Sequence, residues 1–230
     1  MAKQRKNRNG KPLSHILAVD VGGTHVKVMS NVKMEKREFK SDPELTAKTM
    51  VAKVKKLTDD WNYEFVSIGY PGPTVHGHPI AEPVNLGTGW VGFDFGKAFG
   101  RPAKLVNDAV MQALGSYSGG RMLFLGLGTG LGSAMIINGV VEPMELGHLP
   151  YKKGKTFEDL LGRDGMKRAG KKKWRAEVAA AVKHLKSALT PEYVVLGGGN
   201  AKKLKTLPPK TRAGDNDNAF IGGFKLWNGA

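Results

Sequence analysis

Residues 15–30 of this 230-residue chain, HILAVDVGGTHVKVMS, constrain its fold more than any other stretch. An apolar run ends in Asp20, two glycines and a threonine follow, and a second run alternates in polarity, which predicts a β-hairpin with a polar tip. Gly22 and Gly23 can adopt φ > 0 and let a large anion approach the backbone, while Asp20 and Thr24 add a carboxylate and a hydroxyl. This chemistry suits a phosphate and its magnesium ion. An ordinary Gly-Gly hairpin is the alternative.

A second stretch repeats this pattern in the other half of the chain. Residues 122–132, MLFLGLGTGLG, predict a strand and a glycine turn with a threonine, and another strand follows to Ile137. Asn138-Gly139 then signals a hairpin turn. A third glycine turn, Gly197-Gly-Gly-Asn200, follows a predicted strand over residues 193–196. Two related hairpins suggest that the chain has two similar halves.

Helices are expected between these strands. Ser41-Asp-Pro-Glu44 has the residues of a helix start and a capping box, and an apolar helical face continues to about Leu57. Asn107-Asp108 is expected to cap a helix over residues 109–117, and a long basic helix is expected over residues 174–189. Alternating strands and helices predict an α/β protein. Its expected parts are a disordered basic arm (1–14), an N-terminal domain (15–108) and a C-terminal domain (109–230).

Composition narrows the classes of function. The mean hydropathy of −0.31 is that of a soluble protein, and no apolar run approaches the roughly 20 residues that span a bilayer. The basic first residues lead into no apolar signal stretch, so no export is expected. The chain has no cysteine, which excludes disulfides and thiolate metal sites. These features fit a cytoplasmic protein with no membrane-spanning segment.

A net charge of +16 favours anionic partners such as nucleic acid, an acidic membrane or a polymeric phosphate. Solvated surface could account for any single basic cluster, but four clusters with few acidic residues nearby are harder to explain in this way. The clusters are Lys3–Lys11, Lys152–Lys155, Lys167–Arg175 and Lys202–Arg212.

The three glycine turns, in their order along the chain, resemble the phosphate-1, phosphate-2 and adenosine motifs of the sugar-kinase, hexokinase and actin superfamily. Within that superfamily, Asn107-Asp108, Glu145-Leu-Gly-His148 and Glu158 resemble the sugar site of the ROK family. The chain lacks a cysteine-rich zinc motif and has a short segment before Glu145. In both features it resembles the polyphosphate glucokinase branch of the ROK family. The resemblance covers about residues 15–200.

The resemblance implies two ribonuclease H-like (actin/hexokinase-type) α/β domains around a central cleft. It also implies Mg²⁺ as cofactor, no structural zinc and a homodimer. The expected reaction transfers a phosphoryl group from inorganic polyphosphate, or also from ATP, to the 6-hydroxyl of glucose. The alternatives are an ATP-dependent ROK hexokinase acting on glucose, mannose or an amino or N-acetyl sugar, and a sugar-responsive regulator. The residues before the first strand are too few for a helix-turn-helix domain, which argues against the regulator and against nucleic acid as a partner.

Roles follow for individual residues. Asp108 is the expected catalytic base, and its alternative role is only that of a helix cap. Asp20 is expected to hold Mg²⁺ directly or through water, and Lys27 faces either the phosphoryl donor or solvent. The residues expected to bind phosphate are Asp20, Gly22, Gly23, Thr24, Lys27, Gly128, Thr129 and Gly130. The residues expected to bind sugar are Gly72, Asn107, Asp108, Glu145, His148 and Glu158.

The rest of the donor is expected to follow Gly197 and Gly198 and a track of basic side chains that includes Lys167, Lys171 and Lys172. A solvated helix face is the alternative for these lysines. His148 and Glu158 also have purely structural alternatives, because a lone histidine is often buried in a satisfied environment and Glu158 can lie on a surface helix.

Overall fold

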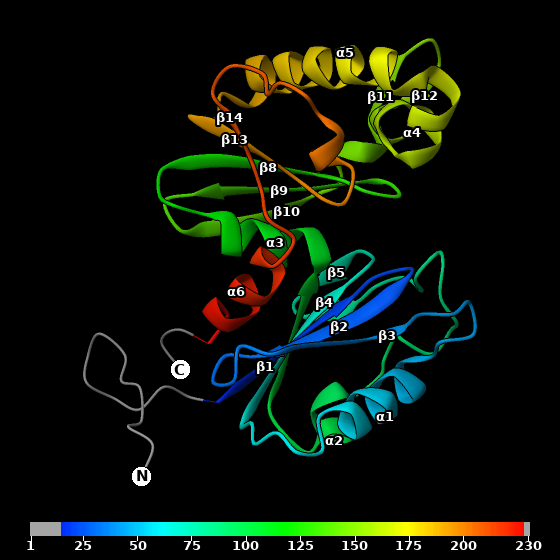
Figure 1. The fold of residues 1–230 in the computed structure, drawn as a ribbon, viewed down its shortest axis with the longest axis vertical. Helices are drawn as coiled ribbons and strands as arrows, with labels where there is room; N and C mark the ends of the chain where they lie inside the picture. Colours follow the sequence, from blue (N-terminus) through cyan, green and yellow to red (C-terminus); the bar gives the residue numbers. More distant parts are fainter. Residues whose placement is uncertain (1–14, 228–230) are drawn as a thin grey trace. The chain divides into compact units, whose positions relative to one another are not determined.

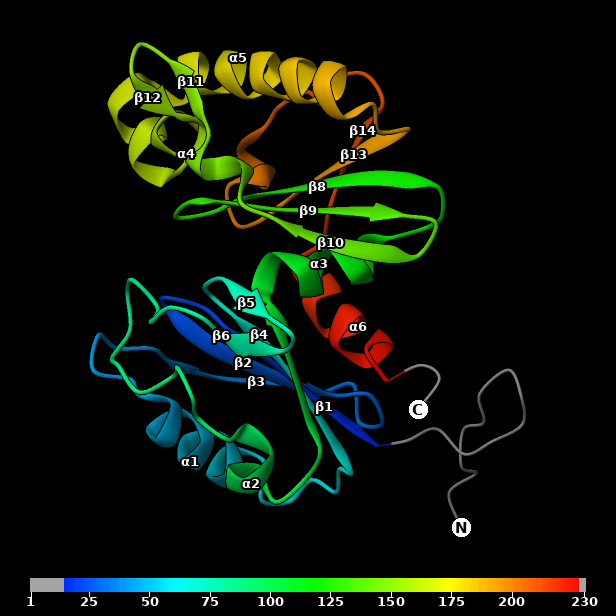
Figure 2. The same cartoon turned by 180° about the vertical axis from the view of Figure 1, so that it is seen from behind.

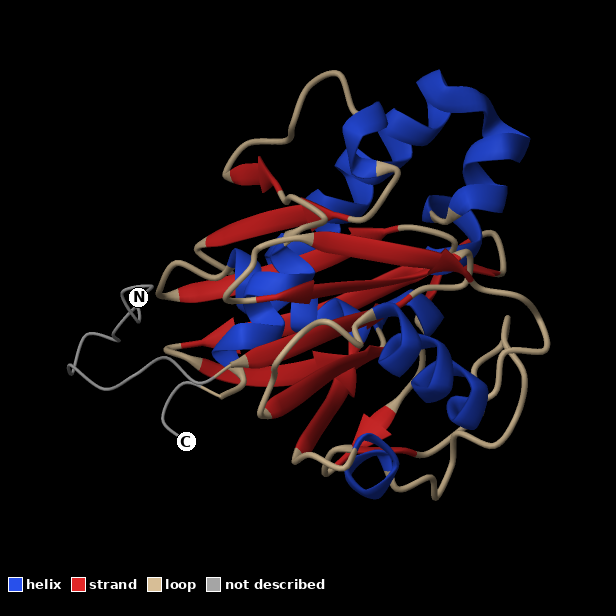
Figure 3. Ribbon diagram, turned by 60° about the horizontal axis from the view of Figure 1, so that its bottom comes forward, coloured by secondary structure: helices blue, strands red, loops and turns tan. Residues whose placement is uncertain are grey.

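The computed structural model describes residues 15–227, so the basic arm predicted over residues 1–14 lies outside the described part. The described chain forms two compact units (Figure 1). One contains residues 15–107 and 223–227, and the other contains residues 108–222. Each unit is an α/β structure with its own five-stranded sheet, flanked by helices (Figure 3).

The sheet of the first unit has the strand order β3-β2-β1-β4-β7. Strands β1, β4 and β7 are parallel, whereas β2 and β3 run antiparallel to their neighbours. The predicted hairpin is confirmed, since β1 pairs with β2 up to the register Val21↔Val26. The strands are β1 (Ile16–Val21), β2 (His25–Ser30), β3 (Lys36–Lys40), β4 (Phe65–Tyr70) and β7 (Ala103–Asn107). A small hairpin of β5 (Thr74–Val75) and β6 (His78–Pro79) follows β4.

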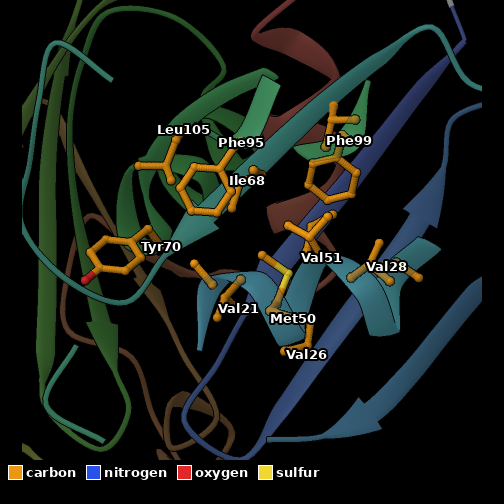
Figure 4. Packing of buried hydrophobic residues seen from close by; sticks show 14 of the residues in the cluster. Val21, Val26, Val28, Met50, Val51, Ile68, Tyr70, Phe95, Phe99 and Leu105 are labelled. Atoms are coloured by element: carbon orange, nitrogen blue, oxygen red, sulfur yellow. The ribbon is translucent and has the colours of Figure 1, made fainter. Parts of the chain in front are cut away.

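Helices α1 (Ala47–Leu57) and α2 (Phe95–Phe99) lie on one face of this sheet (Figure 1). Figure 4 shows Met50 of α1, Phe95 of α2 and Ile68 of β4 within one cluster of buried apolar side chains. Trp90, from the loop before α2, is completely buried in the same core. Burying large apolar side chains removes their surface from water and stabilises the unit.

The start of α1 differs from the sequence prediction. The helix begins at Ala47, and its capping box is formed by Thr46 and Thr49 instead of Ser41 and Glu44. Ser41 is diverted from capping because its backbone and side chain both bind the tip of the first hairpin. The predicted cap was therefore wrong, and Ser41 has a different structural role.

The sheet of the second unit has the order β10-β9-β8-β13-β14. Its strands are β8 (Arg121–Leu127), β9 (Leu131–Ile137), β10 (Val140–Met144), β13 (Tyr193–Gly197) and β14 (Thr211–Ala213). Strands β8, β13 and β14 are parallel, and the β8–β9–β10 meander is antiparallel. This is the connectivity of the first sheet, so the expectation of two similar halves is confirmed. Asn138 and Gly139 both have positive φ, as the predicted turn requires.

Helix α3 (Asp108–Ser116) lies on one face of the second sheet, and α4 (Phe157–Leu161) and α5 (Arg163–Leu189) lie on the other (Figures 1 and 2). The basic helix starts earlier than the predicted Trp174, and it is interrupted at Gly170, where φ is +75°. The shorter elements are β11 (Pro150–Lys152), β12 (Lys155–Thr156), the 3₁₀ helices η1 (Leu146–His148) and η2 (Ala201–Lys203), and α6 (Asn218–Lys225).

The C-terminal residues return to the first unit, which differs from the expected domain of residues 109–230. The buried Ser67 hydroxyl donates to the carbonyl of Gly223 at 2.5 Å and accepts from the Trp227 indole N–H at 2.9 Å. The rings of Trp227 and Phe65 lie 4.5 Å apart. These contacts join residues that are far apart in sequence. The chain therefore passes from the first unit to the second after Asn107 and returns to the first after Gly222. No helix within residues 15–227 is long and apolar enough to cross a membrane.

Candidate functional site

The tip of the first hairpin is fixed by hydrogen bonds to its backbone. The Gly22 N–H donates to the His25 carbonyl at 3.0 Å. The Ser41 hydroxyl donates to the Gly22 carbonyl at 2.6 Å, and the Ser41 N–H donates to the Thr24 carbonyl at 2.9 Å. Neither Gly22 nor Gly23 has a positive φ. Glycine is needed here for closeness, because a Cβ at residue 22 would lie 3.0 Å from the His25 oxygen.

Asp20 lies at the end of β1, in register with Lys27 on β2. Burial raises the pKa of the Asp20 carboxyl to about 6, and the nearby Lys27 charge opposes this rise. Desolvation disfavours the charged form of a carboxyl group, so the Asp20 carboxylate gains stability from a bound cation. The structure thus places Asp20 and Lys27 together beside the glycine tip.

The surroundings of Asp20 fit one kind of metal. Among the described residues, no group of three or more His, Asp or Glu side chains is arranged to hold an ion. Mg²⁺ in phosphate-transfer sites is commonly bound by one or two carboxylates, with water and substrate phosphates as the other ligands. A single partly desolvated carboxylate fits an ion that arrives with a phosphate.

Asn107 and Gly72, both predicted sugar residues, are brought together in the first unit. The Asn107 amide donates to the Gly72 carbonyl at 3.0 Å. Gly72 packs closely on the Tyr70 ring, since a Cβ at this position would lie 2.7 Å from that ring. The Tyr70 hydroxyl in turn donates to the carbonyl of Ala81 at 2.7 Å. The loop after β4 is therefore held rigidly beside Asn107.

Asp108 is the first residue of α3. Its Oδ1 accepts a hydrogen bond from the Ala109 N–H at 2.7 Å, which places the carboxylate at the positive end of the helix dipole. This contact is consistent with the alternative role of Asp108 as a helix cap. The same contact orients the carboxylate, as a general base requires.

The second hairpin is held by a side chain from α4. At its tip, the Gly128 N–H donates to the Gly130 carbonyl at 3.1 Å. Just beyond the tip, the Leu131 N–H donates to Oε2 of Glu158 at 2.9 Å. The Glu158 carboxylate also lies directly against Gly130, where a Cβ would overlap Oε2. Glu158, predicted from its sequence context to bind sugar, is therefore also joined to the glycine hairpin.

Glu145 and His148 lie beside Glu158. His148 Nδ1 is 3.9 Å from Glu145 Oε2 across η1. Burial raises the pKa of Glu145, the His148 charge opposes this, and the Glu158 charge adds to it. The Ser133 hydroxyl anchors η1, because it donates to the Met144 carbonyl at 2.7 Å and accepts from the Leu146 N–H at 3.1 Å. Three of the predicted sugar residues thus form one polar cluster next to the second hairpin.

Asn200 joins the third glycine turn to the second hairpin through two hydrogen bonds. The Asn200 N–H donates to the Leu127 carbonyl at 2.9 Å, and its side-chain amide donates to the Gly128 carbonyl at 2.8 Å. Gly198 has φ +79°, and a Cβ there would lie 2.5 Å from the Leu127 oxygen. The sequence predicted the turn but indicated no role for Asn200. Its place directly after three glycines was the only available signal.

The predicted lysine track lies on the first part of α5. Lys167 pairs with Asp164 at 3.3 Å, and Lys171 and Lys172 are exposed beyond the break at Gly170. The first residue of the helix, Arg163, donates its N–H to the Thr129 carbonyl at 3.0 Å. The start of α5 is thus attached to the second hairpin.

Comparison with solved structures identifies the fold. An inorganic polyphosphate/ATP-glucomannokinase from Arthrobacter sp. strain KM superposes with a TM-score of 0.79 at 23% identity, covering 93% of this chain and 98% of that one. A ROK family glucokinase from Streptomyces griseus, in complex with glucose and AMPPNP, gives 0.76 at 15% identity, covering 94% and 100%. The fold is the two-domain α/β fold of ROK and hexokinase-type sugar kinases.

Sequence comparison then gives the family. The ROK family model matches residues 16–159, so the chain belongs to the ROK family. A polyphosphate glucokinase of Mycobacterium tuberculosis (strain ATCC 25618 / H37Rv) is 26% identical over 212 residues, covering 82% of this chain and 79% of that protein. A bifunctional enzyme NanE/NanK of Brucella melitensis biotype 1 is 24% identical over 242 residues, covering 82% of this chain and 46% of that protein. The fold and family expected from the glycine motifs are confirmed.

The raised pKa of Asp20 predicts a pH-dependent effect of Asp20→Asn. From pH 4 to 6 the folded protein binds the Asp20 proton more tightly than the unfolded chain does, so this residue lowers stability as the pH rises. Above pH 6 we expect Asp20→Asn to raise the free energy of unfolding by about 3 kcal/mol, and most of this gain should disappear near pH 4. Urea unfolding at pH 4, 6 and 8 without divalent ions measures it, with the exposed Asp59→Asn as control. A gain that is the same at all three pH values contradicts the assignment.

The hydrogen bond from Leu131 to Glu158 predicts a local effect on the second hairpin. Glu158→Ala removes the acceptor, so the Leu131 amide hydrogen should exchange at least tenfold faster. Glu158→Gln keeps an acceptor oxygen and should leave the exchange rate within about threefold of the original. Residue-resolved hydrogen exchange measures both variants, and equal exchange in Glu158→Ala and the original protein would show that Glu158 does not hold the hairpin.

Proposed function

We propose that this ROK-family protein is a sugar kinase that transfers a phosphoryl group from inorganic polyphosphate to the 6-hydroxyl of glucose. The observation that carries the proposal is the hydrogen bond from the Leu131 N–H to Glu158. It joins a glycine hairpin suited to phosphate to a cluster of two carboxylates and an imidazole suited to sugar hydroxyls. A kinase needs these two kinds of group next to each other.

Phosphoryl transfer depends mainly on alignment and charge neutralisation. In the proposed reaction, both glycine hairpins bind phosphate through N–H groups and hydroxyls, and the residues that do so are Gly22, Gly23, Thr24, Gly128, Thr129 and Gly130. Lys27 adds a positive charge beside Asp20. Mg²⁺, when held by Asp20, neutralises charge on the donor oxygens.

The acceptor hydroxyl loses its proton to Asp108, which acts as general base. Gly72, Asn107, Glu145, His148 and Glu158 bind the remaining sugar hydroxyls. Each buried polar group of such a site penalises a sugar that leaves it unpaired, which is the source of specificity for one hexose. Because Glu158 also contacts the second hairpin, its orientation links sugar binding to the donor loop.

Polyphosphate is proposed as donor because the chain carries a net charge of +16 and is similar to polyphosphate glucokinases. Gly197 and Gly198 lie where the donor continues beyond the second hairpin, and Lys167, Lys171 and Lys172 extend the positive surface on α5. A polymer with about one negative charge per phosphate binds such a surface electrostatically. An ATP-dependent ROK hexokinase that acts on glucose, mannose or an amino or N-acetyl sugar is the second candidate, and the similarity to a glucokinase solved with AMPPNP favours it.

A coupled assay for sugar phosphate, with polyphosphate and ATP offered separately, tests the proposal. We expect Mg²⁺-dependent formation of glucose 6-phosphate, with a higher kcat/KM for polyphosphate than for ATP. A higher kcat/KM for ATP would support the second candidate. Absence of product from glucose, mannose, glucosamine and N-acetylmannosamine with either donor would overturn the kinase proposal.

A further inference from the structure

Asn200 fixes a basic side chain next to the second hairpin. The Asn200 side chain is 6% exposed, and its amide donates to the Gly128 carbonyl. Its other side-chain atom, Oδ1, accepts a hydrogen bond from the Lys203 ammonium at 2.6 Å. The Lys203 charge is therefore held two hydrogen bonds away from the hairpin proposed to bind donor phosphate. The flexible side chain of a lysine normally loses entropy when it is ordered, and here Asn200 has already ordered it.

Arg175 supports the same position from α5. Its Nε donates to the Lys203 carbonyl at 2.7 Å, so the basic first half of α5 and the turn at η2 meet here. Among the residues that the structure describes, no carboxylate lies within ion-pair distance of Lys203 or Arg175. An ammonium and a guanidinium without acidic partners attract an anion strongly.

The backbone surface beside Lys203 is open. A Cβ added at Gly128 would meet nothing within 4 Å, and the same is true at Gly199. By contrast, Gly198 is pressed against Leu127. The hairpin and the third glycine turn therefore present bare backbone at Gly128 and at Gly199, and an anion can approach this backbone closely.

We propose that Lys203, positioned by Asn200 and supported by Arg175, binds phosphoryl groups of the donor beyond those held at the second hairpin, and that it thereby favours polyphosphate over ATP. This inference rests on the proposed function. Every phosphate along a polyphosphate chain carries negative charge. In ATP only the three phosphates are charged, and the adenosine beyond them is neutral. Lys203 therefore discriminates between donors by charge, with its remaining N–H groups donating to phosphate oxygens.

Lys202 provides a matched control. It neighbours Lys203 and carries the same charge, but it is exposed and makes no hydrogen bond among the described contacts. Lys203→Gln and Lys202→Gln remove one positive charge each. Lys203→Arg keeps the charge and a donor for Asn200, so it serves as the conservative variant.

Steady-state kinetics with both donors tests the proposal. We expect Lys203→Gln to raise the KM for polyphosphate about tenfold and the KM for ATP less than threefold, while Lys203→Arg recovers most of the polyphosphate affinity and Lys202→Gln changes the KM values less than twofold. Equal losses with both donors, or equal effects of Lys202→Gln and Lys203→Gln, would overturn the assignment. Unchanged circular dichroism and melting temperature establish that the variants are folded.

Equilibrium binding of polyphosphate without sugar separates this inference from the proposed function. The logarithm of the binding constant falls linearly with the logarithm of salt concentration, with a slope that reflects the number of phosphate contacts. Lys203→Gln should weaken binding and make this slope shallower by about one. A protein that shows this change but makes no sugar phosphate would refute the kinase proposal and retain the Lys203 site. An active kinase with an unchanged slope in Lys203→Gln would refute the Lys203 site alone.

Discussion

A glycine hairpin that binds an anion must be rigid while its surface stays free of side chains. The backbone N–H groups at such a tip bind a phosphate only if the turn keeps its shape, yet glycine is the residue with the greatest conformational freedom. In this protein the rigidity comes from side chains located elsewhere in each unit. Ser41 holds the first hairpin, and Asn200 and Glu158 hold the second.

These anchoring contacts also connect the hairpins to the other groups of the site. Glu158 belongs to the cluster with Glu145 and His148, so the same carboxylate contacts the hairpin proposed to bind the donor and lies among the groups proposed to bind sugar. Asn200 positions Lys203, so the contact that stiffens the hairpin also places a cation beside it. In the first unit, desolvation of Asp20 favours a bound cation at the tip. Rigidity and ligand chemistry therefore arise from the same few contacts.

The sequence predicted what is local in the fold. The alternation of apolar residues around Asp20 and around Thr129 predicted both hairpins, and Asn138-Gly139 predicted its turn. The sequence could not predict the partners of Ser41. A serine followed by Asp and Pro resembles a helix cap, whereas in the folded chain Ser41 lies beside Gly22. Likewise, the return of the C-terminus to Ser67 depends on contacts between distant parts of the sequence.

The candidate site was predictable to a similar extent. The motifs named the residues, and the structure adds that the Asn107 amide donates to the Gly72 carbonyl and that His148 lies beside Glu145. The resemblance named Glu158 as a sugar residue but not its hydrogen bond to the second hairpin, and Asn200 had no sequence signal beyond its position after the third glycine turn. Side-chain hydrogen bonds to a distant backbone depend on tertiary structure, and neither residue periodicity nor a short motif encodes their geometry.

The account depends most on Asp108, which begins the second unit and is proposed to take the proton from the sugar. The most direct test is to compare kcat and sugar affinity in Asp108→Asn, because asparagine keeps the size and the helix-capping ability of aspartate but is not a base. The account predicts that kcat falls about a thousandfold while the dissociation constant for glucose changes less than threefold. A variant with near-normal kcat would show that Asp108 is a helix cap and not the catalytic base.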